Sequence, residues 1–238
     1  MTTTLEKRFD EHVVQRRLGN GSVDIRVATH RCPTARSIIV NYPGFRGEIG
    51  GFNDKYVKIA NDIVGREIAA VVRMANVKYQ DLEYGMSVID DLYTVIDFTL
   101  RQAHRLCATH DPELYLMGFS AGAGSVAAVS PDYREIKKLL LVAPSLDATR
   151  AEVESGLGAF EGDVYVAIGD KDSVVGPQAG QLFYDMATKA RSRKLVVVKN
   201  CDHQFRGTEN GKILSNAPLW AFADDQTFPS PDGGIELY

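Results

Sequence analysis

Cysteine is scarce in this chain, and its spacing excludes two kinds of structure. The 238 residues include only three cysteines, Cys32, Cys107 and Cys201, which are widely separated and form no C-x-x-C pair. Neither a disulfide framework nor a zinc site fits an odd, scattered set, so reduced thiols are expected. Cys201 lies two residues before His203, but neighbouring side chains on a turn seldom face each other. Thiol catalysis is therefore not expected.

Long apolar runs and strong charge are also missing. No apolar run approaches the ~18 residues that cross a membrane. The first ten residues lack the apolar core of a secretory signal, so we expect a cytoplasmic protein. The net charge of -4 provides no basic field for nucleic acid or anionic lipid. The expected partner is a small-molecule substrate, and the sequence carries no signal of oligomeric state.

What the chain does contain is an alternation of strand-like and helix-like segments. Apolar residues recur at helical spacing in 52–64, 87–103 and 178–190, which predicts three helices. Asn53 is the expected cap of the first helix, and Gly65 is its expected end. Alternating strands and helices predict one α/β domain over residues 1–238, a mostly parallel sheet with helices on both faces. Short apolar runs typical of buried parallel strands occupy residues 37–42, 68–72, 114–118, 137–142, 164–168 and 195–198.

Three further segments complete the predicted architecture. Residues 12–18 and 22–29, joined by Gly19-Asn20-Gly21, predict an antiparallel hairpin at the sheet edge. The link between residues 143 and 163 is short and only weakly helical, so no large cap domain is expected. Beyond Ala217 the chain is rich in Pro, Asp and aromatic residues, and Trp220 and Phe222 are expected to pack against the body.

The strongest chemical signal is a serine flanked by glycines. Gly118 and Gly122 enclose Ser120 in the spacing G-x-S-x-G, between an apolar run and an alanine-rich segment. Small residues at these positions allow a sharp strand-to-helix turn that exposes the serine Oγ. Such a hydroxyl is a candidate nucleophile. The alternative is a serine that only caps the helix.

A nucleophilic serine needs a base and an acid that orients the base. Loops that follow parallel strands converge at one edge of the sheet, so groups that follow these strands are expected to meet in one crevice. Ser120 would attack, and His203, the only histidine downstream of it, would take the proton. Asp170 and Asp172 both follow the strand at 164–168, and either would orient the imidazole.

These residues resemble the α/β-hydrolase fold family in order and in local pattern. The resemblance extends from residue 37 to residue 207 and rests on the G-x-S-x-G turn, on a D-H pair before an aromatic residue at 202–205, and on G-x-x-D-x-x-V at 169–175. It implies Asp172 as the acid of a Ser120, Asp172, His203 triad. It also implies hydrolysis without metal or organic cofactor.

The same resemblance implies two oxyanion donors. One is the backbone N–H of Ala121, which follows the nucleophile. Matching Pro43-Gly44-Phe45 to the family's usual H-G-x implies Phe45 as the other, with Arg46 as the alternative because Pro43 departs from that pattern. The glycine-rich loop is similar to that of small lidless esterases and dienelactone-hydrolase-like proteins. The serine nucleophile departs from dienelactone hydrolase itself.

The activity expected from this resemblance is cleavage of a small carboxylic ester through an acyl-serine intermediate. A thioesterase or a serine peptidase would use the same triad, and a non-catalytic binding protein on the same fold is a further alternative. Three basic residues near the loops, Arg46, Lys78 and Arg206, would suit an anionic substrate group, although exposed basic residues are common.

Overall fold

A nine-stranded sheet runs through the part of the chain that the computed structural model describes, which comprises residues 9–19, 21–77, 84–146, 150–223, 227–229 and 235–237. The strand order is β1-β2-β4-β3-β5-β6-β7-β8-β9. The six neighbouring strands β4, β3, β5, β6, β7 and β8 are parallel, and antiparallel strands flank them at both edges. The strands are β1 Asp10–Leu18, β2 Gly21–His30, β3 Ser37–Tyr42, β4 Ala70–Met74, β5 Glu113–Phe119, β6 Ile136–Val142, β7 Asp163–Gly169, β8 Ser192–Val198 and β9 Ile235–Leu237.

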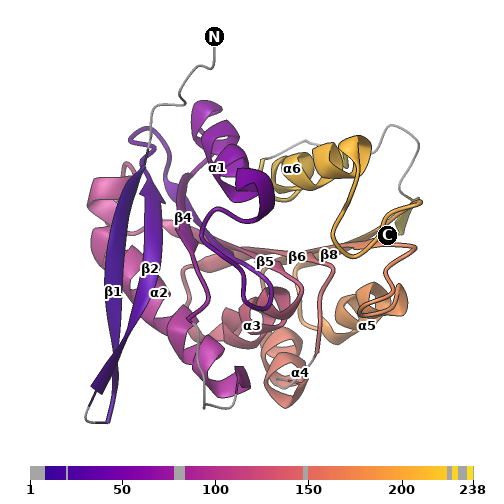
Figure 1. Ribbon diagram of the computed structural model, residues 1–238, viewed down its shortest axis with the longest axis horizontal. Helices are drawn as coiled ribbons and strands as arrows, with labels where there is room; N and C mark the ends of the chain where they lie inside the picture. Colours follow the sequence, from indigo (N-terminus) through magenta and orange to yellow (C-terminus); the bar gives the residue numbers. More distant parts are fainter. Residues whose placement is uncertain are drawn as a thin grey trace.

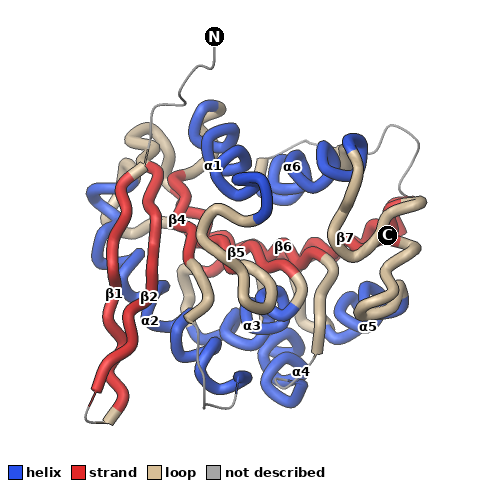
Figure 2. Tube along the Cα trace, viewed as in Figure 1, coloured by secondary structure: helices blue, strands red, loops and turns tan. Residues whose placement is uncertain are grey.

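Helices cover both faces of this sheet (Figure 1). Helices α1 and α6 lie on one face, and α2 to α5 lie on the other, as the tube view also shows (Figure 2). Between β6 and β7 the described residues hold α4 alone, and no large cap domain is present among them. The helices are α1 Lys55–Gly65, α2 Tyr84–Leu106, α3 Ala121–Val129, α4 Arg150–Ala159, α5 Gln178–Met186 and α6 Thr208–Phe222.

The sheet divides the core into two apolar clusters because successive side chains of a strand point to opposite faces. Along β3, Ile38 and Val40 pack with residues of α2 to α5, whereas Ile39 packs with residues of α1 and α6. All six residues of β3 are buried, as is expected of a central parallel strand. The predicted parallel sheet with helices on both faces is confirmed.

The predicted edge hairpin is also confirmed, since β1 pairs only with β2 in the sheet order (Figure 1). Asn20 of its turn lies outside the described residues. The predicted strand at 68–72 instead occupies 70–74, and the polar segment that follows is described only as far as residue 77. Trp220 and Phe222 are buried, as expected, but they belong to α6, a helix that the sequence pattern did not predict.

The start of α1 differs from the prediction. Asn53 does not cap this helix; it lies in a short 3-10 turn, Phe52–Asp54, and α1 begins at Lys55. Asn53 and Asp54 both have positive φ, 52° and 55°, and the N–H of Tyr56 donates to the carbonyl of Gly50. The Gly50 carbonyl therefore accepts a hydrogen bond from the first turn of α1, which a side-chain cap would otherwise accept. Gly65 ends the helix as predicted.

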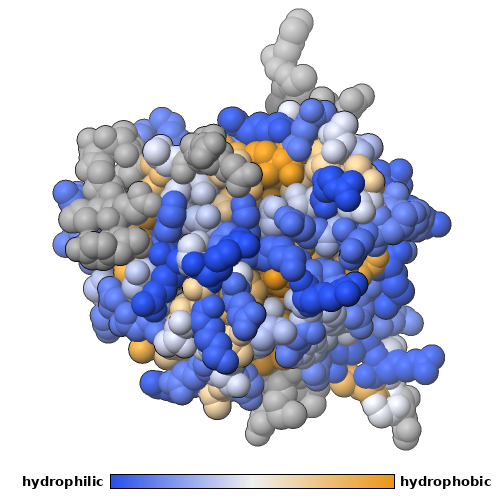
Figure 3. All heavy atoms as spheres, turned by 180° about the vertical axis from the view of Figure 1, so that it is seen from behind, coloured by the Kyte–Doolittle hydropathy of each residue, from blue (hydrophilic) through white to orange (hydrophobic). Residues whose placement is uncertain are grey.

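The exterior is ordinary in character. On the face turned away from the view of Figure 1, hydrophilic residues predominate, and hydrophobic residues show in small patches between them (Figure 3). Within the described residues, no helix combines the length and the apolar character that a membrane crossing requires.

Candidate active site

Ser120 occupies a strained turn between β5 and α3. Its φ of 54° and ψ of -122° are unfavourable for a residue with a side chain. The turn closes only because its neighbours are glycines: a Cβ at Gly118 would lie 2.4 Å from the Cα of Ala123, and one at Gly122 would lie 2.3 Å from the oxygen of Pro43. The Ser120 side chain makes no cap hydrogen bond to α3. The alternative of a capping serine is therefore wrong.

The histidine and one aspartate meet this serine. His203 Nε2 lies 3.0 Å from Ser120 Oγ, and His203 Nδ1 lies 2.8 Å from Asp172 Oδ2. Ser120 is half-buried, and the other two side chains are buried, with 5% of His203 and 2% of Asp172 exposed. Side chains that are 83 and 31 positions apart in sequence thus form one continuous hydrogen-bonded chain.

The Asp172 carboxylate is held by its own loop. Its Oδ1 accepts the backbone N–H groups of Val174 and Val175 at 3.0 and 3.1 Å, which leaves Oδ2 for the imidazole. An acceptor at Nδ1 selects the tautomer in which Nε2 accepts the serine proton. Asp170 has a different contact: its carboxylate lies 3.8 Å from the Lys171 ammonium. The structure therefore brings Asp172, and not Asp170, to His203.

Cys201 lies near Asp172, but its thiol is unsuited to act as a nucleophile. It is buried, and burial raises the pKa of its thiol to about 12, with further contributions from the carboxylates of Asp202, Asp170 and Asp172. A thiol that stays protonated at neutral pH is a poor nucleophile. This agrees with the expectation that Cys201 takes no part in thiol catalysis.

The loop after β3 is clamped into a fixed turn beside the serine. A Cβ at Gly44 would lie 3.1 Å from the Ser120 Cβ, so the loop backbone touches the nucleophile. The Gly44 carbonyl accepts the Gly47 N–H at 2.8 Å and the Asn76 side-chain nitrogen at 2.5 Å, and the Asn76 N–H donates to the Gly47 carbonyl at 3.0 Å. Two residues of the loop are thus tied to the end of β4.

This clamp orients the peptide that precedes Phe45. Asn76 follows β4, on one side of β3, whereas Ser120 follows β5, on the other side. In a trans peptide the carbonyl and the N–H point in opposite directions. Because the Gly44 carbonyl points toward Asn76, the Phe45 N–H points away from Asn76. Ala121 opens α3, where N–H groups have no partner within the helix.

A cleft of about 560 Å³ opens over the serine. Three strongly exposed hydrophobic side chains belong to its wall: Phe45 is 56% exposed, Phe52 is 82% exposed and Val174 is 68% exposed. Three charged residues line it as well, Arg46, Glu48 and Lys55. The remaining lining residues are Pro43, Gly44, Gly47, Gly51, Tyr56, Phe119, Ser120, His203 and Gln204.

No protein-family model matches the chain, and no curated protein is similar to it in sequence. Solved structures do match. Est1E from Butyrivibrio proteoclasticus matches 87% of this chain with 95% of its own length, at 16% identity and a TM-score of 0.68. Dienelactone hydrolase from Anabaena variabilis matches 90% of this chain with 97% of its own length, at 13% identity and a TM-score of 0.68. An α/β serine hydrolase homologue from Coxiella burnetii matches 89% of this chain with 96% of its own length, at 19% identity and a TM-score of 0.66. The fold is that of the α/β hydrolases.

In this α/β-hydrolase fold, the candidate residues reach the cleft from loops that follow strands β3, β5, β7 and β8. The structure places Ser120, Asp172 and His203 together, and it places Phe45 and Ala121 beside them. Of the three basic residues considered for an anionic group, Arg46 lines the cleft, Arg206 is exposed and pairs with Asp202 at 3.6 Å, and Lys78 lies outside the described residues.

Two residues of this site carried no recognisable signal in the sequence. Asn76 begins a polar segment after β4 that could shape a binding cleft but is more typical of a surface loop, and no pattern distinguished Asn76 within it. Lys55 is the first residue of α1 and resembles any helical surface lysine until the structure places it in the cleft. Among the described residues, no cluster of three or more His, Cys, Asp or Glu side chains is arranged to hold a metal ion.

Proposed function

We propose that this protein is a serine hydrolase that cleaves a small carboxylic ester through an acyl-serine intermediate. The observation that supports it most directly is the chain of hydrogen bonds from Ser120 to His203 and from His203 to Asp172, at 3.0 and 2.8 Å. Nucleophile, base and orienting acid within hydrogen-bond reach are the arrangement that activates a serine. The α/β-hydrolase fold and its esterase neighbours support the same proposal.

In the acylation step, Ser120 Oγ attacks the ester carbonyl while its proton passes to His203 Nε2. Asp172 stabilises the imidazolium that forms and keeps the ring in position. The carbonyl oxygen becomes an oxyanion, and the N–H groups of Phe45 and Ala121 donate to it. His203 then returns the proton to the departing alkoxide, so that the alcohol leaves and the acyl group remains on Ser120.

Deacylation repeats these steps with water as the nucleophile. His203 Nε2 removes a proton from the water, whose oxygen attacks the acyl-serine carbonyl. The same two N–H groups bind the second oxyanion. Collapse of this intermediate returns the proton to Ser120 Oγ and releases the carboxylic acid.

The cleft supports a modest, partly apolar substrate. Its volume of about 560 Å³ falls within the range of small-molecule pockets, and Phe45, Phe52 and Val174 provide apolar surface at its wall. One of the structural neighbours, Est1E from Butyrivibrio proteoclasticus, is known with ferulic acid bound. An ester of a small aromatic or apolar acid is therefore the first substrate to test.

Ser120→Ala tests the nucleophile. We expect the native protein to react with a fluorophosphonate probe and to hydrolyse 4-nitrophenyl esters, and the variant to lose labelling and at least about 10³-fold in kcat. Ser130→Ala is a matched control, because the Ser130 hydroxyl is buried at the end of α3 and donates to the Ala127 carbonyl. Equal labelling of Ser120→Ala and native protein would overturn the proposal. Matched ester, thioester and amide substrates then rank the bond that is cleaved.

A further inference from the structure

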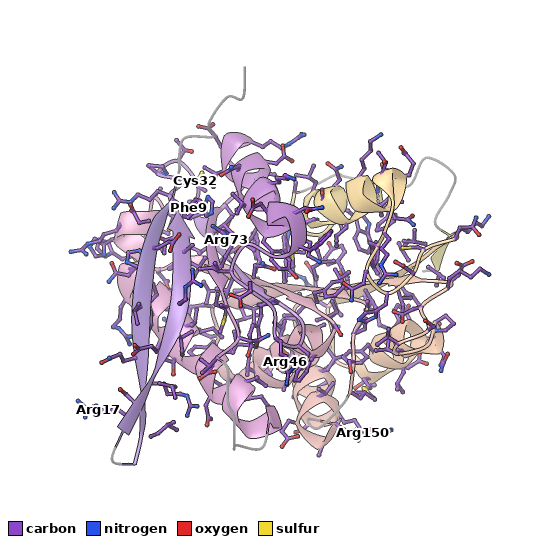
Figure 4. The ribbon with its side chains drawn as sticks, in the orientation of Figure 1. Phe9, Arg17, Cys32, Arg46, Arg73 and Arg150 are labelled. Atoms are coloured by element: carbon purple, nitrogen blue, oxygen red, sulfur yellow. The ribbon has the colours of Figure 1, made fainter. Side chains whose placement is uncertain are left out.

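The charges that line the cleft contrast with the charge of the protein. The chain as a whole carries a net charge of -4, yet Arg46 and Lys55 both line the cleft. Glu48, the one acidic lining residue, has a cationic partner, since its carboxylate lies 3.7 Å from the Arg26 guanidinium. Arg46 lies on the loop between β3 and α1 (Figure 4). The charge that the cleft offers to a ligand is therefore positive.

Lys55 is the more confined of the two cations. Its ammonium lies 4.3 Å from the centre of the Phe119 ring and 5.0 Å from that of Tyr56. No carboxylate lies within ion-pair distance of it among the described residues. Partial burial lowers the pKa of this amine, because the charged form has lost water without gaining an anion. The two rings replace only part of that lost hydration.

The position of this ammonium places it on the nucleophile's side of the cleft. Phe119 directly precedes Ser120, and its ring centre lies 5.4 Å from that of His203. One ring thus contacts the ammonium and lies beside the catalytic imidazole. A substrate whose carbonyl sits at Ser120 has Lys55 within the same cleft, next to the apolar wall.

We propose that Lys55 binds a carboxylate of the substrate, so that the preferred substrate class is an ester that bears a second, free carboxylate on an apolar or aromatic frame. This inference rests on the proposed hydrolase function and specifies its substrate. The carboxylate completes the ammonium's coordination with a charge-assisted hydrogen bond, and the frame lies against the exposed hydrophobic wall. Lys55 is then a residue of substrate specificity and takes no part in the proton transfers.

The test compares esters that differ by one charge. The 4-nitrophenyl esters of terephthalic acid and of terephthalamic acid share one shape, but the first ends in a carboxylate and the second in a carboxamide; the isophthalic pair varies the position of that group. For at least one pair we expect kcat/KM to favour the anion about tenfold, the size of one charge-assisted hydrogen bond. Lys55→Met should remove this preference, and Lys55→Arg should retain most of it.

Lys58→Met is the matched control. Lys58 lies one turn further along α1 and is exposed, and its ammonium donates to the Asn53 carbonyl at 2.8 Å. This control should keep the native preference for the anion, and added salt should weaken the preference in native protein. Hydrolysis of both members of each pair at equal kcat/KM, or a preference that survives Lys55→Met, would overturn the anion subsite while leaving the hydrolase proposal intact.

A binding measurement separates the two proposals completely. Ser120→Ala protein is titrated calorimetrically with monomethyl terephthalate and with methyl terephthalamate, which requires no turnover. Binding of the anion about tenfold more tightly, lost when Lys55→Met is added, supports the subsite even if no ester is cleaved. Equal binding, or no binding, of the two compounds refutes it. Failure of the hydrolase proposal is recognised independently, by native protein that neither reacts with the fluorophosphonate nor cleaves any ester.

Discussion

At the scale of single residues, the acid of the site illustrates how position decides function. Asp170 and Asp172 lie two positions apart, and both follow β7. Asp172 Oδ2 lies 2.8 Å from His203, and its other oxygen accepts two backbone N–H groups. Asp170 has the Lys171 ammonium as its ionic neighbour. Only Asp172 is thus placed to hold the imidazole in the tautomer that accepts the serine proton.

Substitution of each aspartate by asparagine tests this assignment. Asp172→Asn keeps the shape but presents an uncharged amide to the imidazole, so we expect kcat to fall by about 10³-fold or more. Asp170→Asn is the matched control, and we expect it to lose less than about tenfold. Steady-state kinetics on one 4-nitrophenyl ester measures both. An active Asp172→Asn together with an inactive Asp170→Asn would reverse the assignment.

At the scale of elements, the loop from β3 to α1 depends on its contacts with β4. The turn from Gly44 to Gly47 contains Arg46 with a φ of 53°, a conformation that side chains rarely adopt. Asn76 bonds this turn twice, once through its backbone N–H and once through its side chain. Further along the loop, the buried Arg73 donates to the Ile49 carbonyl at 2.5 Å. The residues at the end of β4 therefore hold this loop, and with it the Phe45 peptide proposed as an oxyanion donor, in one conformation.

Asn76→Asp tests this positioning role. The carboxylate cannot donate to the Gly44 carbonyl and repels it, so the Phe45 peptide loses its orientation. Loss of one oxyanion donor typically costs ~10²–10³ in rate, and we expect a loss of this order in kcat with KM changed less than about threefold. An unchanged melting temperature would exclude general unfolding.

Asn216→Asp is the control for that experiment. The Asn216 side chain also donates to a backbone carbonyl, that of Lys212 at 2.8 Å, but it is located in α6. We expect this variant to retain native kcat. If Asn76→Asp raised KM and left kcat unchanged, the clamp would serve substrate binding, and the role assigned to it here would be wrong.

At the scale of the whole molecule, a buried hydrogen bond between an arginine and a neutral histidine links an outer strand of the sheet to the active-site loop. Arg73 of β4 and His30 of β2 are each 1% exposed, and Arg73 Nε donates to His30 Nε2 at 2.9 Å (Figure 4 labels Arg73). His30 can accept this bond only when its ring is neutral. Burial, and then the nearby Arg73 charge, lower the pKa of His30 from 6.5 to about 3.

This shift predicts acid instability of the fold. Below about pH 6.5 the unfolded chain binds a proton at His30, whereas the native state does not until about pH 3. The stabilisation is therefore complete above pH 6.5 and decreases as the pH falls toward 3, by up to ~1.4 kcal/mol per pH unit. His30→Gln retains an acceptor for Arg73 but does not titrate. Urea unfolding between pH 7 and 4 should show a shallower pH dependence in this variant, and equal slopes would contradict the shift.

Much of the architecture was predictable because local patterns determine it. The parallel strands and the edge hairpin follow from apolar runs and glycine turns, and the structure confirms them. The predictions failed where contacts with residues outside the segment itself override its local preference. Asn53 has the chemistry of a helix cap, but the turn of the preceding loop moves the start of α1 to Lys55. Helix α6 contains Pro218 and weak local signals, and the apolar cluster that it buries accounts for its formation.

The features of the candidate site also divide into those that local sequence determines and those that tertiary contacts determine. The sequence by itself determined the order of serine, acid and histidine and the glycines that the strained turn requires, because these are properties of short segments. The resemblance at 169–175 also indicated Asp172 over Asp170, and the tertiary structure joined Asp172 to His203. Only the tertiary structure placed Lys55 in the cleft and joined Asn76 to Gly44. These are relations between loops that are brought together only when parallel strands align in one sheet, and no local pattern records which loops become neighbours.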